Sequence, residues 1–254
     1  MRRALIGHTG FVGSNLNQQC EYSHCYNSKN IGDIKGEHFE EIVCAGIQAV
    51  KWWSNQNPKN DWAGIEQLIS VLDSVSADRF TLISTVDVYK TPVAVNESSP
   101  IETDGLQPYG LHRWKAEEWA RAHFPQTLIL RLPGLFGRGL KKNLIFDVLT
   151  EKDLSGFDAR ASFQFYDLAQ LGSDLATAQA AELNTLNIAV QPVTVASVIN
   201  KMTGSNFTNK TGSTSAIYDM QTNHASLWGK TGAYLYDADN CLDRIDDFCQ
   251  SWHP

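Results

Sequence analysis

The 254-residue chain has few of the features that mark membrane or nucleic-acid-binding proteins. Its apolar runs fall short of the roughly 20 residues that a membrane helix needs, and we expect no signal peptide before the first predicted strand. Basic residues are outnumbered, 21 against 28 acidic ones, and the formal charge of −7 leaves no footprint for nucleic-acid phosphates. These absences predict a protein without membrane or nucleic-acid partners.

Cysteine is also scarce, with five residues and no CxxC pair among them. An odd count without paired spacing predicts neither a disulfide framework nor a zinc knuckle. The seven histidines show no ligand spacing either. We therefore expect a cytoplasmic protein without a metal site.

Short apolar runs recur along the chain at intervals that leave room for helices. Each run is nearly continuous rather than alternating, which is typical of strands buried on both faces of a parallel sheet. Helical periodicity occupies residues 62–72 and 109–123. The alternation predicts an α/β fold with a doubly wound parallel sheet. The predicted strands are residues 4–6, a strand ending near residue 27, and residues 41–45, 79–84, 127–132 and 186–190.

The first predicted strand leads into a G-x-x-G-x-x-G motif at Gly7, Gly10 and Gly13. Gly7 permits a tight turn, Gly10 lets the backbone approach a pyrophosphate, and Gly13 lets helix and strand pack closely. Amides at the start of the following helix then face the anion. Plain tight turns also contain such glycines, but the position between strand and helix predicts a dinucleotide site.

The choice between NAD and NADP depends on the end of the second strand, where an acidic residue commonly binds the adenosine ribose. This chain has no Asp or Glu there and contains Asn27, Ser28 and Lys29 instead. Their amide, hydroxyl and ammonium groups suit a 2′-phosphate, which slightly favours NADP over NAD. A polar turn that happens to contain a lysine explains the same residues equally well.

A second group of candidate residues follows the fourth predicted strand. Thr85 lies at the carboxyl end of that strand, where ligands bind in such sheets. Tyr109 begins a predicted helix, and Arg113 lies one turn later on the same face. A cation beside a phenol favours the phenolate, so we expect Arg113 to lower the pKa of Tyr109 for proton transfer. The alternative is an interfacial tyrosine beside a solvated arginine.

The order of four motifs resembles the extended short-chain dehydrogenase/reductase family, of the NAD-dependent epimerase/dehydratase type. The likeness is specific over residues 1–150, thinner to about 203 and weak thereafter. The four motifs are the glycine turn, Ser84-Thr85-Val86-Asp87-Val88-Tyr89, Pro108-Tyr109-Gly110 and the segment from Leu130 to Gly139.

The resemblance implies a Rossmann-type domain that binds NAD or NADP, and a homodimer. The dinucleotide-binding domain is expected over residues 1–150. Residues 151–254 are expected to return one strand, about 186–190, to the sheet and to form a small C-terminal substrate lobe. Besides the glycines, Asn27, Ser28 and Lys29, the implied cofactor-binding residues are Thr9, Phe11, Val12, Ala45, Arg113, Leu132 and Pro133.

The resemblance also implies roles at the reacting centre. Tyr109 is the expected acid/base, Thr85 steadies the substrate oxygen, and Asp87 and Gly134 are further substrate contacts. Arg113 stands where the family normally has lysine; it is expected to tune the phenol and to touch the cofactor ribose. Many relatives have asparagine at the position of Gly134, and the C-terminal lobe is short for a nucleotide-sugar pocket.

We therefore predict an NAD(P)-dependent oxidoreductase or epimerase that transfers hydride at a carbinol or carbonyl carbon. Its substrate is a small molecule, with a sugar or nucleotide sugar as the candidate class. The alternative is a catalytically silent NAD(P)-binding sensor or scaffold, which the arginine and the short lobe favour. A minority hypothesis is a sugar-nucleotide dehydratase with Asp87 as base, although Val86 stands where such enzymes usually carry a second acid.

Overall fold

A computed structural model describes residues 1–212 and 215–252. Contacts divide the chain into two compact units that alternate along the sequence. The first unit comprises Met1–Thr91, Pro100–Arg131 and Ala169–Leu186, and the second comprises Pro92–Ser99, Leu132–Leu168 and Asn187–Pro254. The domain boundary expected near residue 150 stays a prediction.

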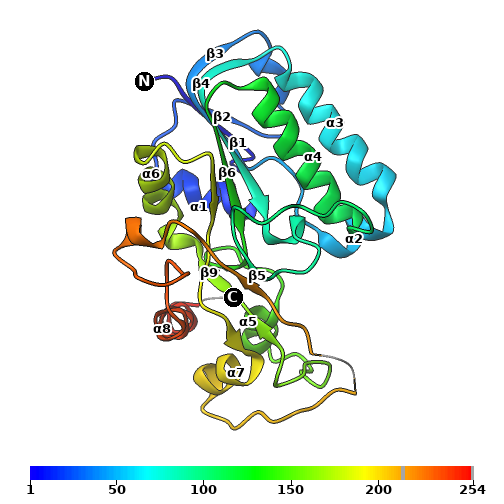
Figure 1. The fold of residues 1–254 in the computed structure, drawn as a ribbon, viewed down its shortest axis with the longest axis vertical. Helices are drawn as coiled ribbons and strands as arrows, with labels where there is room; N and C mark the ends of the chain where they lie inside the picture. Colours follow the sequence, from blue (N-terminus) through cyan, green and yellow to red (C-terminus); the bar gives the residue numbers. More distant parts are fainter. Residues whose placement is uncertain (213–214, 253–254) are drawn as a thin grey trace. The chain divides into compact units, whose positions relative to one another are not determined.

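The first unit is built on a six-stranded sheet with the strand order β10-β6-β4-β3-β1-β2 (Figure 1). Strand β1 pairs in parallel with β2 and β3, and β3 pairs in parallel with β4. The predicted doubly wound α/β sheet is thereby confirmed. The strands are β1 (Arg3–Ile6), β2 (His24–Tyr26), β3 (His38–Cys44), β4 (Ser76–Thr85), β6 (Thr127–Leu132) and β10 (Thr185–Asn187).

The strand expected at residues 186–190 is displaced, because β10 ends at Asn187. The amide of Ala189 donates to the carbonyl of Asn187 at 2.8 Å, which turns the chain out of the ladder. Val190 instead forms an isolated bridge with Tyr236. The apolar run therefore continues for three residues beyond the point where sheet pairing stops.

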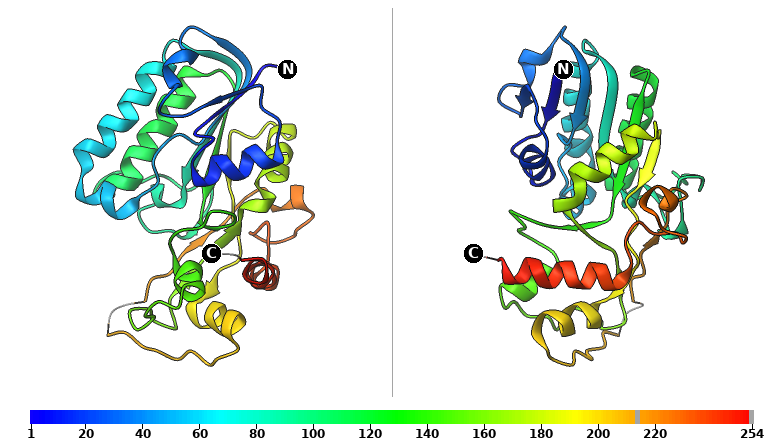
Figure 2. Two further views of the ribbon diagram at one scale, coloured as in Figure 1. Left: turned by 180° about the vertical axis from the view of Figure 1, so that it is seen from behind. Right: turned by 90° about the vertical axis from the view of Figure 1, so that its left-hand side faces the viewer.

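Helices cover both faces of the sheet (Figures 1 and 2). Helices α3 and α4 contact each other on one face, and α1 and α6 contact each other on the opposite face. Both α3 and α4 begin with proline at a position where the missing amide hydrogen has no helical partner to lose. The helices of this unit are α1 (Phe11–Gln19), α2 (Lys51–Gln56), α3 (Pro58–Leu72), α4 (Pro108–His123) and α6 (Leu171–Ala180).

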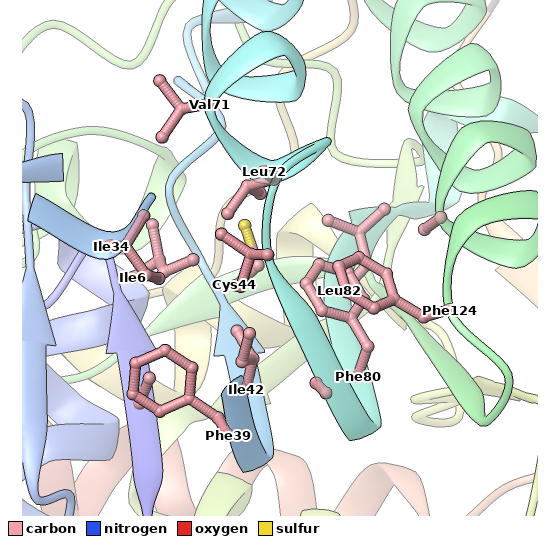
Figure 3. Close-up of a cluster of buried hydrophobic side chains, with 14 of the residues drawn as sticks. Ile6, Ile34, Phe39, Ile42, Cys44, Val71, Leu72, Phe80, Leu82 and Phe124 are labelled. Carbon is pink, nitrogen blue, oxygen red and sulfur yellow. The ribbon is translucent and has the colours of Figure 1, made fainter. Parts of the chain in front are cut away.

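The core between the sheet and helices α3 and α4 explains the continuous apolar runs of the strands (Figure 3). Ile42 and Phe80 come from neighbouring strands and are fully buried, as is Leu72 of α3. The ring of Phe80 stacks on Phe124, with centroids 4.0 Å apart. Burying each such side chain contributes about 1.5–3 kcal/mol, so the sheet is a rigid support for residues at its carboxyl edge.

The second unit contains short paired strands and helices. Helix α7 contacts α5 and α8. The buried Gln164 donates to the carbonyl of Met220 at 2.7 Å and accepts from its amide at 2.7 Å, which joins distant segments. The paired strands are β5 (Val93–Val95) with β12 (Asp219–Met220), β7 (Gly134–Phe136) with β9 (Phe165–Asp167), and β8 (Ser162–Phe163) with β11 (Val193–Thr194). The helices are α5 (Leu144–Leu149), α7 (Val195–Thr203) and α8 (Ala238–Gln250).

Within the described ranges of both units, no helix has the length and apolar character needed to span a membrane.

Candidate active site

The glycine turn lies where the winding of the sheet reverses. From β1 the chain passes to β2 on one side and then to β3 on the other, so the carboxyl ends of β1 and β3 flank the switch point. Gly7 follows β1 with φ of +85°, and a Cβ there would lie 2.4 Å from the carbonyl oxygen of Ala45. The predicted cofactor contact Ala45 thus lies beside the turn, and the close crossing requires glycine at position 7.

The other two glycines have separate structural reasons. A Cβ at Gly13 would lie 2.1 Å from the carbonyl oxygen of Gly7, whereas a Cβ at Gly10 would meet that oxygen at 3.3 Å. The first turn of α1, which begins at Phe11 and includes Val12, contains no acidic residue. Its leading amides have no acceptor within the helix and favour an anion. Together with Thr9, these residues fit a dinucleotide diphosphate.

The two glycines allow packing to be separated from binding by experiment. We expect Gly13→Ala to lower the free energy of unfolding by about 1–3 kcal/mol, measured by urea denaturation, because the methyl group overlaps backbone. We expect Gly10→Ala to lower the stability of the ligand-free protein less than Gly13→Ala does, but to lose the increase in Tm on adding dinucleotide. An unchanged Tm increase in Gly10→Ala would contradict a diphosphate at this turn.

The turn after β2 is tied to the glycine turn, because the amide of Gly7 donates to the carbonyl of Tyr26 at 2.7 Å. Within it, the side-chain oxygen of Asn27 accepts from the amide of Lys29 at 2.9 Å. The side chains of Ser28 and Lys29 are exposed. The contacts of Asn27, Ser28 and Lys29 with a 2′-phosphate stay a prediction, and Asn27 already has a role in the turn.

Thr85, Asp87 and Tyr109 are brought together by the turn that follows β4. Thr85 caps the short 3-10 helix η2 (Val86–Val88), and its hydroxyl oxygen accepts from the amide of Asp87 at 3.2 Å. Helix α4 starts against this turn because Gly110 has no side chain; a Cβ there would lie 1.9 Å from the carbonyl oxygen of Asp87. Tyr109, which precedes Gly110, is thus held beside Thr85 and hydrogen-bonds its side chain.

Tyr109 is 7% exposed, and burial raises the pKa of its phenol above the ordinary value. The charge of Arg113, the hydrogen bond with Thr85 and the charge of Lys51 act in the opposite direction, while Asp87 adds to the increase. Arg113 therefore acts on the pKa of this phenol in the expected direction, but burial outweighs it and the pKa is raised overall. Loss of hydration of the phenolate outweighs the cations.

Arg113 is buried and firmly held. Its guanidinium donates to the two carboxylate oxygens of Asp61 at 2.6 and 2.9 Å. It also donates to the carbonyls of Gln48 and Tyr109, and its central carbon lies 4.0 Å from the centroid of the Tyr109 ring. The guanidinium is thus fixed over the ring face of Tyr109. Its contact with a cofactor ribose stays a prediction.

Sequence reasoning missed two charged residues of this site. Asp61 accepts from Arg113, from Ser54 at 2.7 Å and from His112 at 2.7 Å. Lys51 donates to Asp87 at 2.6 Å. The sequence carries a signal for Asp61 alone, since this carboxylate lies on the buried face of α3.

Leu132, Pro133 and Gly134 belong to the second unit. Gly134 pairs with Phe165, and a Cβ at Gly134 would lie 2.8 Å from the carbonyl oxygen of Gln164. Pairing of β7 with β9 therefore accounts for glycine at this position. The cofactor contacts of Leu132 and Pro133 and the substrate contact of Gly134 stay predictions.

These features define a Rossmann-type α/β protein with a glycine turn at its switch point and a buried tyrosine at the edge of its sheet. No protein-family profile matches the sequence, and no curated protein sequence matches it. Solved structures match over nearly the whole chain.

Three solved structures illustrate the likeness. The NAD-dependent NDP-hexosamine 5,6-dehydratase TunA, involved in tunicamycin biosynthesis, has a TM-score of 0.75 at 17% identity, covering 100% of this chain and 99% of its own. UDP-N-acetylglucosamine 4-epimerase from Methanobrevibacter ruminantium has a TM-score of 0.76 at 12% identity, covering 98% and 97%. The dTDP-4-dehydrorhamnose reductase from Bacillus anthracis has a TM-score of 0.75 at 13% identity, covering 99% and 98%. The chain has the fold of these enzymes, which confirms the predicted resemblance at the level of fold.

Proposed function

We propose that this protein is an NAD(P)-dependent oxidoreductase or epimerase that transfers hydride at a carbinol or carbonyl carbon. The observation that carries the proposal is the buried phenol of Tyr109, which hydrogen-bonds Thr85 and lies against the guanidinium of Arg113. The glycine turn, in which Gly10 presents no side chain, supports a bound diphosphate in the same unit. The names of the structural neighbours specify a dehydratase, an epimerase and a reductase, and the reductase was solved with NADP.

Tyr109 is the proton-transferring group of the proposed reaction. When bound, the nicotinamide dinucleotide supplies the hydride acceptor or donor. During oxidation of a carbinol, the phenolate of Tyr109 takes the hydroxyl proton; during reduction, the phenol returns a proton to the carbonyl oxygen. In the proposed reaction, the hydroxyl of Thr85 hydrogen-bonds the same oxygen. Because the phenol is buried, its deprotonated form needs positive charge nearby.

For the substrate we propose a sugar or nucleotide sugar, since the names of the neighbours include an NDP-hexosamine, a UDP-linked and a dTDP-linked sugar. The test is incubation of the purified chain with NAD or NADP and a panel of UDP- and dTDP-sugars. Reduced nicotinamide is followed by absorbance and the sugar product by mass spectrometry. The proposal would be contradicted if no sugar is turned over and no hydrogen exchange occurs at any sugar carbon.

A second candidate reaction is dehydration with Asp87 as base. It is favoured by the position of Asp87, whose carboxylate lies 3.5 Å from the hydroxyl of Thr85. Mass spectrometry separates the two reactions, because a dehydrated product lacks one water and an epimer does not. Asp87→Asn should then abolish water loss while leaving hydride transfer measurable.

For the cofactor we propose NADP ahead of NAD, on the strength of Lys29. We expect Lys29→Ala to weaken NADP binding on the order of tenfold, because an ammonium–phosphate hydrogen bond is lost, and to leave NAD binding unchanged. Thermal shifts with each dinucleotide measure both affinities. Lys35→Ala, which removes an exposed lysine six positions later, is the matched control. An equal loss for both dinucleotides in Lys29→Ala would remove the reason for preferring NADP.

We further propose a cytoplasmic homodimer. All five cysteines lie within the described residues and are free thiols, which suits a reducing compartment. The dimer rests on the resemblance alone. Light scattering after size-exclusion chromatography measures the mass of the particle and would contradict the dimer by finding a monomer at working concentration.

A further inference from the structure

The proposed reaction needs positive charge near the phenolate of Tyr109. Arg113 is poorly suited to increase its effect on the phenol when the phenolate forms. The side chain of Arg113 is 4% exposed and that of its partner Asp61 is 2% exposed. Two carboxylate oxygens and two backbone carbonyls hold the guanidinium. The charge of the guanidinium is therefore neutralised by Asp61, and its position over the ring face of Tyr109 is fixed.

A second cation reaches the site from helix α2. Lys51 donates to Asp87 at 2.6 Å, and the two side chains are 46% and 19% exposed. This ion pair is therefore open to solvent, unlike the pair formed by Arg113 and Asp61. Water lowers the energy that holds an exposed ion pair, so the pair of Lys51 and Asp87 is held more weakly than the buried pair of Arg113 and Asp61.

The position of α2 is set by two side chains near its end. The hydroxyl of Ser54 donates to Asp61 at 2.7 Å. The side-chain oxygen of Asn55 accepts from the backbone amide of Tyr109 at 3.0 Å. Asn55 lies four residues after Lys51, so both occupy one face of the helix, and that face is turned to the start of α4. The contact that aligns Tyr109 thus also brings Lys51 to the site.

We propose that Lys51 is a positioning residue that supplies, from a separate helix, the cation stabilising the Tyr109 phenolate, and that Asp87 controls how strongly this charge acts on the phenol. The charged groups that act on the phenol are Arg113 from α4, Lys51 from α2 and Asp87 from the turn after β4. A substrate hydroxyl that donates to Asp87 would weaken the hold of Asp87 on Lys51 and favour the phenolate. The inference rests on the proposed function for its purpose, but its test needs neither cofactor nor turnover.

The test is an NMR titration of the protein labelled with ¹³C at the Cζ atom of tyrosine, with the Tyr109 signal assigned from Tyr109→Phe. We expect Asp87→Asn to lower the titration midpoint of Tyr109. We expect Lys51→Met in that background to raise the midpoint on the order of one pH unit, since an opposite charge is lost. Starting from Asp87→Asn keeps the titration at lower pH, where the fold is preserved.

Two variants serve as controls. Lys51→Arg retains the charge and should keep the midpoint close to that of the Asp87→Asn protein. Lys59→Met removes an exposed lysine from the neighbouring helix α3 and should leave the midpoint unchanged. A midpoint that stays in place in Lys51→Met, or moves equally in Lys59→Met, overturns the inference.

The failure of this inference is distinguishable from failure of the proposed function. If no dinucleotide binds but the midpoint moves as expected, the proposed function is wrong and Lys51 still acts on the phenol. If hydride transfer occurs but neither the midpoint nor the pH profile of the rate changes in Lys51→Met, the function stands and the role of Lys51 is wrong.

Discussion

Tyr109→Phe is expected to lower kcat by about 100-fold or more, because the substitution removes the oxygen that exchanges a proton with the substrate. The ring remains, so its contact with the guanidinium of Arg113 should persist and the fold should be retained. Hydride transfer measured with saturating dinucleotide reports the loss. Dinucleotide affinity from thermal shift should change little, since the glycine turn that holds the diphosphate is untouched.

The same substitution separates the enzyme from a silent sensor. Tyr22→Phe, which removes a phenol oxygen elsewhere in the first unit, is the control and should leave kcat within a factor of a few. A sensor or scaffold would show no turnover in either protein, with equal dinucleotide binding in both. If the wild-type protein turns over substrate and the Tyr109→Phe variant keeps the same rate, another group must donate the proton. The assignment of Tyr109 would then be wrong.

Asp61→Asn is expected to lower the free energy of unfolding by about 3–5 kcal/mol, because it leaves the buried charge of Arg113 without a counterion. The pair is well buried, with side-chain exposures of 2% and 4%. Urea denaturation followed by circular dichroism measures the change. Asp73→Asn is the matched control, since that carboxylate is 56% exposed and its loss should fall within about 0.5 kcal/mol.

The reason for this loss can be checked with a second variant and with pH. Adding Arg113→Met to Asp61→Asn should recover much of the stability, because no unpaired buried charge remains. Burial acts to raise the pKa of Asp61, but hydrogen bonds from Arg113, Ser54 and His112 outweigh it and hold the pKa below its ordinary value. The carboxylate therefore stabilises the fold above the unfolded-state pKa of about 4, and this contribution falls as pH drops toward the native pKa. As the pH falls over that range, Asp61→Asn should lose less free energy of unfolding than the wild type. An equal loss in both proteins would contradict the stabilising role of the Asp61 carboxylate.

The sheet and the glycine turn could be predicted because their signals are local. Strands buried on both faces give continuous apolar runs, and Gly7, Gly10 and Gly13 are adjacent in sequence to the strand and helix that they join. The pairing of Thr85 with Tyr109 was also predictable, through the order of the family motifs. Each of these features depends on residues within one short segment or on a recurring order of segments.

The ion pairs around Tyr109 could not be predicted in the same way. Asp61 and Arg113 lie 52 positions apart, and Lys51 and Asp87 lie 36 apart, so no local pattern connects them. The net direction of the pKa change at Tyr109 could not be predicted for a related reason. Whether burial or a cation dominates depends on how closely α2, α4 and the turn after β4 enclose the phenol, which is set by tertiary packing.

The two-pronged contact between Arg113 and Asp61 has a consequence for how this sequence can diverge. A lysine at position 113 offers a single ammonium in place of a planar fork, so Asp61 would be left partly unsatisfied in a buried place. Replacing Asp61 first would leave the buried guanidinium of Arg113 without a counterion. Either single substitution gives a less stable protein. Arg113 and Asp61 are therefore expected to be gained or lost together. An ancestor with lysine at 113 would have needed a different residue at 61.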